Sequence, residues 1–270
     1  MEVLYGLHPV EEAVRSGSRR LDCVMLARER KDERLERLAE MCRAAGVRVS
    51  LESRDHLTRM SRTDAHQGAL ALVRERAFLG IEDLLATKSQ PQDGPQKHRF
   101  FLALDGIEDP HNLGALLRTA DGAGVDGVIL PERRSAPVTA TVAKTSAGAS
   151  EHVRIARVTN LVRSLEQMKQ ANVWVLGLDE RGAPDYMDFD FRADCVLVLG
   201  REGAGLHDLV KKTCDHLLRI PMAGMVSSLN VSVAGAVVMY EAMRQRSRPA
   251  EAQAIPKPAA PAKPRKGLGP

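Results

Sequence analysis

The segment LDGIEDPHNLGALLRTADGAGVDGVIL, residues 104–130, contains side chains that could bind an anion or orient a hydroxyl group. A strand is expected to end at Asp105, and Asn112 is suited to the N-cap of the helix that follows. Arg118 lies about two turns further into that helix, among leucines and alanines. A long cation in such a place either extends along apolar surface into water or binds an anion.

A second segment, VLVLGREGAGL at residues 196–206, takes an apolar strand into a loop with three glycines and Glu202. Glycine lets a ligand approach the backbone closely, so this loop could form one wall of a binding site. An ordinary strand–loop–helix connection explains the same residues equally well.

A third segment, IPMAGMVSSLNVSVAGAVVMYEAMRQR at residues 220–246, passes from a strand through a loop into a helix for which Ser227 or Ser228 could be the N-cap. The first half of that helix is apolar on nearly all sides, which predicts burial on all sides. A partner subunit covering one face would account for this in so small a domain. A central helix in a monomer is the alternative.

Regular alternation of strands and helices must position these segments. Strands are expected at 100–104, 127–130, 153–156, 173–178, 195–199 and 217–220, and helices at 113–122, 138–147, 161–170, 206–213 and 229–246. This order predicts an α/β fold with a mostly parallel sheet and helices on both faces. Ligands bind beyond the carboxyl ends of such strands, so the loops after Leu104, Leu178, Leu199 and Ile220 are the ones expected to form a site.

A smaller α/β domain is expected before this one, over residues 1–80, with helices at 8–16, 34–45 and 54–60 and strands at 21–27, 47–51 and 69–73. A linker is expected at 81–98, where residues 87–98 read TKSQPQDGPQKH. The larger domain spans 99–247, and the Pro/Ala/Lys-rich tail at 248–270 is expected to be disordered.

Composition restricts the partners. Residues 1–80 hold 14 Arg and one Lys against 13 acids, which fits contacts with phosphate and equally fits a salt-bridged surface. Aromatic residues are only 3% of the chain, which argues against a platform that stacks bases. The four cysteines match no zinc-site spacing and indicate a reducing cytoplasm. No signal peptide, membrane span or metal site is expected.

A glycine pattern, G-x-G-x-x-G at 122–127, closes a helix and precedes a strand. A dinucleotide site needs the reverse order, so we interpret this pattern as a helix C-cap and a tight turn.

The three segments together contain D-x-x-x-D-P-x-N-x-G-A-x-x-R-T-A, L-V-x-G-x-E-G-x-G-L and I-P-M-x-G-x-V-x-S-L-N-V-S-V-A. They resemble the three motifs of the SpoU (TrmH) family of RNA 2′-O-ribose methyltransferases in the SPOUT superfamily, most of all its bacterial 23S rRNA members. YGLHPVEEAV and AHQGALALV resemble that family's L30e-like RNA substrate-binding domain. Arg201 and Ser227 depart from the usual motif residues.

The resemblance implies a deep trefoil knot, bound S-adenosyl-L-methionine, a homodimer packed through helix 229–246, and methylation of a ribose 2′-hydroxyl, with a guanosine of 23S rRNA as the expected target. Implied catalytic residues are Asn112, Arg118, Glu202, Ser228 and Asn230. Implied cofactor-binding residues are Gly177, Gly200, Ile220, Met222, Ser228 and Leu229.

Two alternatives stay open, and a third is rejected. A tRNA methyltransferase or a resistance rRNA methyltransferase keeps the chemistry and changes the substrate. An RNA-binding ribosome-assembly protein would lack the chemistry, although the presence of all five implied catalytic residues argues against it. A nicotinamide oxidoreductase depends on the misplaced glycine pattern alone.

Overall fold

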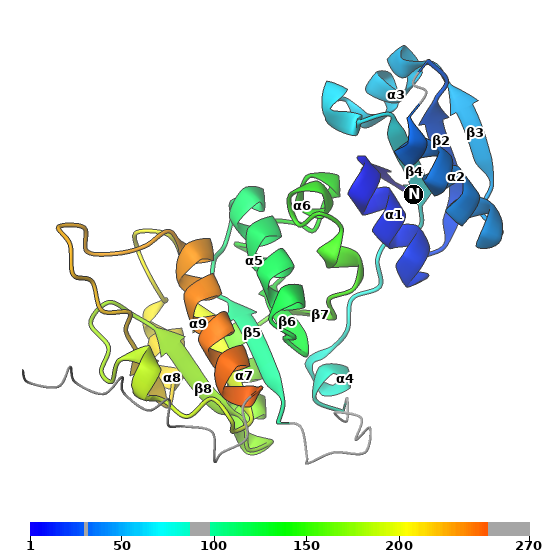
Figure 1. Ribbon diagram of the computed structural model, residues 1–270. Coiled ribbons are helices and arrows are strands. Elements are labelled where there is room, and N and C mark those ends of the chain that lie inside the picture. Colours follow the sequence, from blue (N-terminus) through cyan, green and yellow to red (C-terminus); the bar gives the residue numbers. More distant parts are fainter. Residues whose placement is uncertain (30–31, 87–97, 248–270) are drawn as a thin grey trace, which may run out of the picture.

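The computed structural model describes residues 1–29, 32–86 and 98–247, which form two α/β bodies, each built on its own sheet (Figure 1). The smaller body comes first in the chain, and the larger one includes α4 (Ile81–Ala86) and the elements that follow it. Among the described residues, no helix is long and apolar enough to cross a bilayer.

The smaller sheet contains β1 (Glu2–Tyr5), β2 (Leu21–Ala27), β3 (Val49–Glu52) and β4 (Ala69–Val73) in the order β1-β4-β2-β3. β4 is antiparallel to both of its neighbours, and β2 is parallel to β3. The helices α1 (Leu7–Ser16) and α2 (Glu33–Ala44) share one apolar core with the sheet, and α3 (Arg54–Ser61) packs in a second, smaller cluster through Leu57. A short turn of 3-10 helix, η1 (Asp64–His66), precedes β4. Strand β1 was not expected from the sequence.

The larger sheet has six strands, all parallel, in the order β10-β8-β9-β5-β6-β7. They are β5 (Phe100–Leu104), β6 (Gly127–Pro131), β7 (Ile155–Val158), β8 (Trp174–Leu178), β9 (Cys195–Leu199) and β10 (His216–Leu218). Strands β5 and β9 lie at the centre and every residue in them is buried, which explains their unbroken apolar runs.

Helices cover both faces of this sheet, as the alternation predicted. The helices α5 (Pro110–Gly122) and α9 (Val231–Arg246) pack side by side on one face (Figure 1). On the other face lie α4 (Ile81–Ala86), α7 (Leu161–Gln170) and α8 (Asp208–Thr213). The predicted α/β class with a mostly parallel sheet is therefore confirmed.

The glycine pattern at 122–127 ends α5 and leads into β6, with Gly124 in the left-handed region at φ +70°. The interpretation as a helix end and turn is therefore confirmed.

The segment expected to be a linker begins differently. Residues 81–86 form α4, because Ile81 and Leu84 are buried against the larger sheet, where Leu84 fills the space beside Gly127. Leu79 forms a bridge with Ala156, so the chain is attached to the larger body before the helix begins. The rest of the predicted linker, 87–97, and the predicted tail, 248–270, lie outside the described residues.

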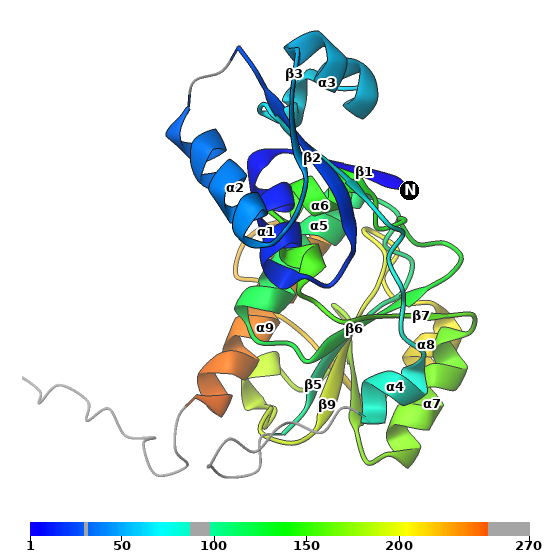
Figure 2. The ribbon, with the colours of Figure 1, turned by 90° about the vertical axis from the view of Figure 1, so that its right-hand side faces the viewer.

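The two bodies meet where α1 packs against α6 (Ala140–Thr145) and η2 (Ala149–Glu151) (Figure 2). Gly148, at φ +89°, permits this approach, because a Cβ there would lie 2.7 Å from Glu12 Cβ. The Glu151 carboxylate, 1% exposed, forms ion pairs with Arg76 at 2.7 Å and Arg19 at 3.6 Å. A buried ion cluster therefore joins the smaller body to the larger one.

Candidate functional site

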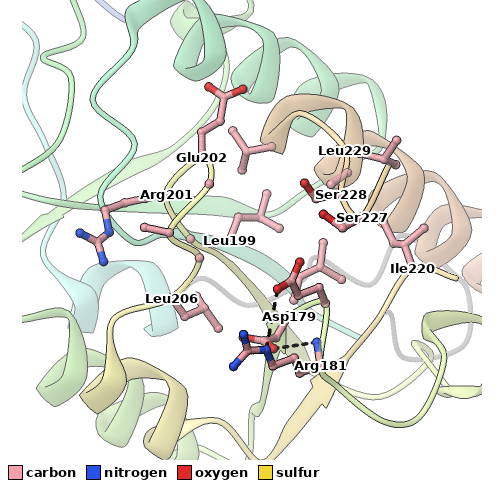
Figure 3. A pocket seen from close by; sticks show the side chains of 18 of the residues that line it. Asp179, Arg181, Leu199, Arg201, Glu202, Leu206, Ile220, Ser227, Ser228 and Leu229 are labelled. Atoms are coloured by element: carbon pink, nitrogen blue, oxygen red, sulfur yellow. Dashed lines mark hydrogen bonds and ion pairs between the residues drawn. The ribbon is translucent and has the colours of Figure 1, made fainter. Parts of the chain in front are cut away.

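A pocket of about 390 Å³ opens beyond the carboxyl ends of β8, β9 and β10 (Figure 3). Its walls come from the loops after Leu178, Leu199 and Ile220, three of the four loops that the sequence predicted. The fourth, after Leu104, does not line the pocket, but it leads into α5, whose first turn lies beside it.

The glycine loop between β9 and α8 forms one wall. Arg201 and Gly205 exchange backbone hydrogen bonds, with N···O distances of 3.0 and 2.9 Å, so the loop folds back on itself. A Cβ on Gly200 would lie 2.2 Å from Gly205 C, which makes glycine necessary at this position. Of the two readings of this segment, the structure supports the one with a binding wall.

Asn112, Glu202 and Asn230, one residue from each sequence segment, meet at one point. Asn112 Nδ2 donates to Glu202 Oε2 at 3.3 Å, and Asn230 Nδ2 donates to Glu202 Oε1 at 3.0 Å and to Asn112 Oδ1 at 3.1 Å. We call these three residues the amide–carboxylate cluster. It ties the starts of α5 and α9 to the glycine loop, and Figure 3 shows Glu202 extending away from Asp179 and Arg181 at the opposite side of the pocket.

The helix caps differ from those expected. Asp109, not Asn112, caps α5, because Pro110 occupies the first helical position and the Asp109 carboxylate accepts from two backbone N–H groups. This leaves the Asn112 side chain free to join the cluster. Likewise Asn230, not Ser227 or Ser228, caps α9, and its Oδ1 accepts from Ser232 N at 2.9 Å. That bond directs Asn230 Nδ2 toward the other two members of the cluster.

Arg118 lies elsewhere. It is exposed, does not line the pocket, and makes no hydrogen bond or ion pair within the part of the chain that the structure describes. Six residues of helix place it about 9 Å along the axis from Asn112. An exposed Arg118 fits both possibilities for this cation, since its guanidinium extends into water and is available to an anion.

Of the implied cofactor-binding residues, five line the pocket: Gly200, Ile220, Met222, Ser228 and Leu229. Gly177 does not. It lies within β8, where a Cβ would meet Cys214, Leu206 and Leu217 side-chain atoms at 2.8 Å, so these side chains pack directly against the glycine.

Sequence reasoning missed a charged end of the pocket. Asp179, Glu180, Arg181, Asp208 and Lys211 line it. Lys211 Nζ donates to Asp179 Oδ2 at 2.7 Å, and Arg181 N donates to Oδ1 at 2.9 Å. Burial alone would raise the pKa of Asp179, but the bonds from Lys211 and Arg181 outweigh it and lower that pKa. The position of DER after a predicted strand was the available signal.

The remainder of the lining is largely apolar, with Leu178, Leu199, Leu206, Val231 and Ala234. Apolar side chains beside a set of fixed charges suit a molecule that has a flat ring system and a zwitterionic tail. S-adenosylmethionine has this chemistry, so the residues fit the implied cofactor. In the described residues, no three His, Cys, Asp or Glu side chains are grouped to hold a metal ion.

The comparisons with known proteins agree with this geometry. Residues 99–240 match the model of the SpoU rRNA Methylase family, and residues 3–79 match the RNA 2′-O ribose methyltransferase substrate binding model. The chain is similar to the 23S rRNA (guanosine-2′-O-)-methyltransferase RlmB of Ralstonia nicotianae, with 41% identity covering 91% of this chain and 96% of that one. It is 40% identical to the Escherichia coli K12 protein of the same name, covering 91% and 99%.

Among solved structures, the chain is similar to the SpoU methyltransferase AviRb from Streptomyces viridochromogenes in complex with AdoMet. The TM-score is 0.74 at 25% identity, covering 91% of this chain and 90% of that one.

Proposed function

The chain belongs to the SpoU rRNA methylase family, and we propose that it transfers a methyl group from S-adenosyl-L-methionine to the 2′-hydroxyl of a guanosine ribose in 23S rRNA. The observation that carries the proposal is the convergence of the loops after Leu178, Leu199 and Ile220 on one pocket, with the amide–carboxylate cluster at its side. The relatives named for that reaction, which the chain matches over nearly their whole length, support this choice of substrate.

The backbone at Gly200, Ile220 and Leu229, with Met222 beside it, would hold the cofactor, which would supply an activated methyl group on its sulfonium. Ser228 lines the same pocket and can hydrogen-bond the cofactor or the target nucleotide. The difficult part is the nucleophile, since a ribose hydroxyl is a very weak acid. The protein must therefore place that oxygen in line with the methyl group and stabilise the negative charge it develops.

The amide–carboxylate cluster is suited to the first task. Glu202 accepts hydrogen bonds from two amides, which fix the orientation of its carboxylate. Asn112 and Asn230 are held in turn, so their remaining hydrogen-bonding capacity is available to a ribose in a fixed direction.

Arg118 is suited to the second task, because a guanidinium stays protonated and can bind both a phosphate and a developing alkoxide. Its distance from its own pocket suggests that it serves the partner's pocket in a homodimer. The exposed surface of α9 supports such a dimer: one face of the helix is buried, while Val233, Tyr240 and Met243 are 49%, 52% and 39% exposed. A second subunit covering α9 would bury these side chains and bring Arg118 to the dimer interface.

Two variants in one dimer test this arrangement. Arg118→Ala and Asn230→Ala are each expected to be inactive as homodimers. Co-expressed, they should form heterodimers with one intact site and regain up to about half of the activity per dimer. No recovery in purified heterodimers would place Arg118 and Asn230 in the same subunit's site.

The substrate is tested by mapping ribose 2′-O-methylation in rRNA and tRNA from cells that lack the gene, and by transfer of labelled methyl groups to each RNA in vitro. In these cells we expect one guanosine ribose of 23S rRNA to lack its methyl group. The reaction itself is expected in the cytoplasm, where ribosomes assemble. Loss at a tRNA position instead would refute the proposed substrate while leaving the chemistry. A chain that binds no S-adenosylmethionine by calorimetry would refute the enzyme itself.

A further inference from the structure

A buried carboxylate holds both ends of the glycine loop. Asp105 follows β5 and is 5% exposed. Its backbone N–H donates to Leu199 O at 2.8 Å, immediately before the loop. Its Oδ2 accepts from His207 N at 2.7 Å and its Oδ1 from His207 Nδ1 at 2.8 Å, immediately after the loop.

The loop between these anchors also rests on the residue that follows Asp105. A Cβ on Gly106 would lie 2.6 Å from Arg201 Cγ and 3.4 Å from His207 Cε1, so both side chains pack directly against the glycine. Gly106 has φ +80°, a conformation that other residues rarely adopt. The path of residues 200–206 is therefore set by contacts at Asp105 and Gly106, outside the pocket.

The bond to His207 has a defined sense. A carboxylate can only accept, so His207 Nδ1 carries the proton whether the ring is neutral or charged. The His207 side chain is 29% exposed and the Asp105 side chain 7% exposed, so water can replace a lost hydrogen bond more easily at the imidazole than at the carboxylate. Losing the donor would leave a buried charge with one hydrogen bond fewer.

The consequence reaches the site through Glu202. This residue lies near the middle of the loop and holds Asn112 and Asn230, and its neighbours form the cofactor wall. His207 itself does not line the pocket. We propose that Asp105 and His207 form a positioning pair that fixes the glycine loop and thereby sets cofactor affinity and the rate of methyl transfer. The link to methyl transfer rests on the proposed function.

Two nearly isosteric substitutions separate the hydrogen bond from the packing. His207→Asn places an amide N–H at the same number of bonds from the backbone as Nδ1, whereas His207→Leu places a methyl group there. If the leucine variant does not fold, His207→Ser replaces it, because serine supplies a hydroxyl suited to a helix start that does not extend to the position of Nδ1. A matched control is His98→Leu, because His98 Nδ1 faces Asp194 Oδ1 at 3.2 Å at the opposite end of β5.

Hydrogen exchange of residues 200–207 in the cofactor-free protein measures the loop directly, calorimetry measures the Kd for S-adenosylmethionine, and steady-state assays give kcat and KM for RNA. For His207→Leu we expect hydrogen exchange in the loop about tenfold faster, a Kd about tenfold higher and a kcat about tenfold lower, with the KM for RNA little changed. These changes correspond to the loss of one charge-assisted hydrogen bond. His207→Asn should stay within about threefold of the wild type, and His98→Leu should match it.

A His207→Leu protein with a lower Tm but wild-type loop exchange and Kd would overturn the proposal, because the pair would then be only structural. Equal losses in the asparagine and leucine variants would overturn it as well. If the wild type methylates no RNA, the proposed function fails, and loop exchange in the cofactor-free protein still decides whether the pair fixes the loop.

Discussion

Replacing Glu151 with alanine is expected to destabilise the folded chain by about 3 kcal/mol. The Glu151 carboxylate is 1% exposed, and its partners Arg76 and Arg19 are 10% and 4% exposed. Burial lowers the pKa of Arg76, and Glu151 is the main group that opposes this effect. After the substitution, the Arg76 guanidinium would remain buried without a carboxylate at hydrogen-bonding distance.

Breaking a buried ion pair from one side costs about 3–5 kcal/mol. The lower end applies here because Arg19 keeps Glu2 as an ion-pair partner and donates to Arg74 O at 2.9 Å through Nε. At about 2–4 °C per kcal/mol for chains of this size, Tm should fall by about 6–12 °C.

Differential scanning calorimetry measures this change in Tm. We expect one unfolding transition for the wild type. Because the ion cluster joins the two bodies, that transition should broaden or divide in the variant. Glu151→Gln, which keeps the shape and removes the charge, should reproduce most of the loss. Glu12→Ala is the matched control, since Glu12 pairs with His152 across the same contact but is 19% exposed, and should cost no more than about 1 kcal/mol. A Glu151→Ala loss no larger than that of Glu12→Ala would refute the reasoning.

Three further predictions follow from the same structure. Arg118→Ala should lower kcat by at least about 100-fold while calorimetry shows unchanged affinity for S-adenosylmethionine, because the residue does not line the pocket; full turnover would remove it from the mechanism. Removing residues 1–73 spares the bridge between Leu79 and Ala156, so the remaining protein should fold and bind the cofactor but should not methylate 23S rRNA. Retained activity on rRNA would show that another surface selects the RNA. Burial raises the pKa of Cys42 and Cys195 to about 11 and that of Cys214 to about 12, which keeps these thiols protonated at pH 8. Their alkylation at pH 8 should therefore be slow in the folded protein and fast in urea, and it should accelerate as the pH rises toward 11. Rapid labelling of these thiols in the native chain at pH 8 would contradict this.

The sequence alone was sufficient where a local pattern has one physical solution. Strands β5 and β9 match the expected ranges residue for residue, since each is a continuous apolar run that ends at a polar residue or glycine. The three motifs likewise sufficed to indicate the family and the reaction, because residue types in that order and spacing rarely coincide by chance.

Elements whose formation depends on distant partners were not predictable in this way. Strand β1 has only four residues and exists because it pairs with β4, with Leu4 opposite Ala71. Helix α4 is stabilised by the sheet beneath it, and its six residues read as linker when that sheet is unknown. The Asp-Pro pair at 109–110 did contain the signal for the true start of α5, although Asn112 was the more obvious cap.

The site shows the same division. The sequence determined which loops follow strands, and hence that they lie at one edge of the sheet. Only the strand order β10-β8-β9-β5 decided that loops separated by about 20 residues along the chain become neighbours. Likewise, only the tertiary structure decided that Asn112 contacts Glu202 while Arg118 is exposed and lies outside the pocket. The physical reason is that a residue's type and helical phase are local properties, whereas its neighbours across a sheet are set by the packing of the whole chain.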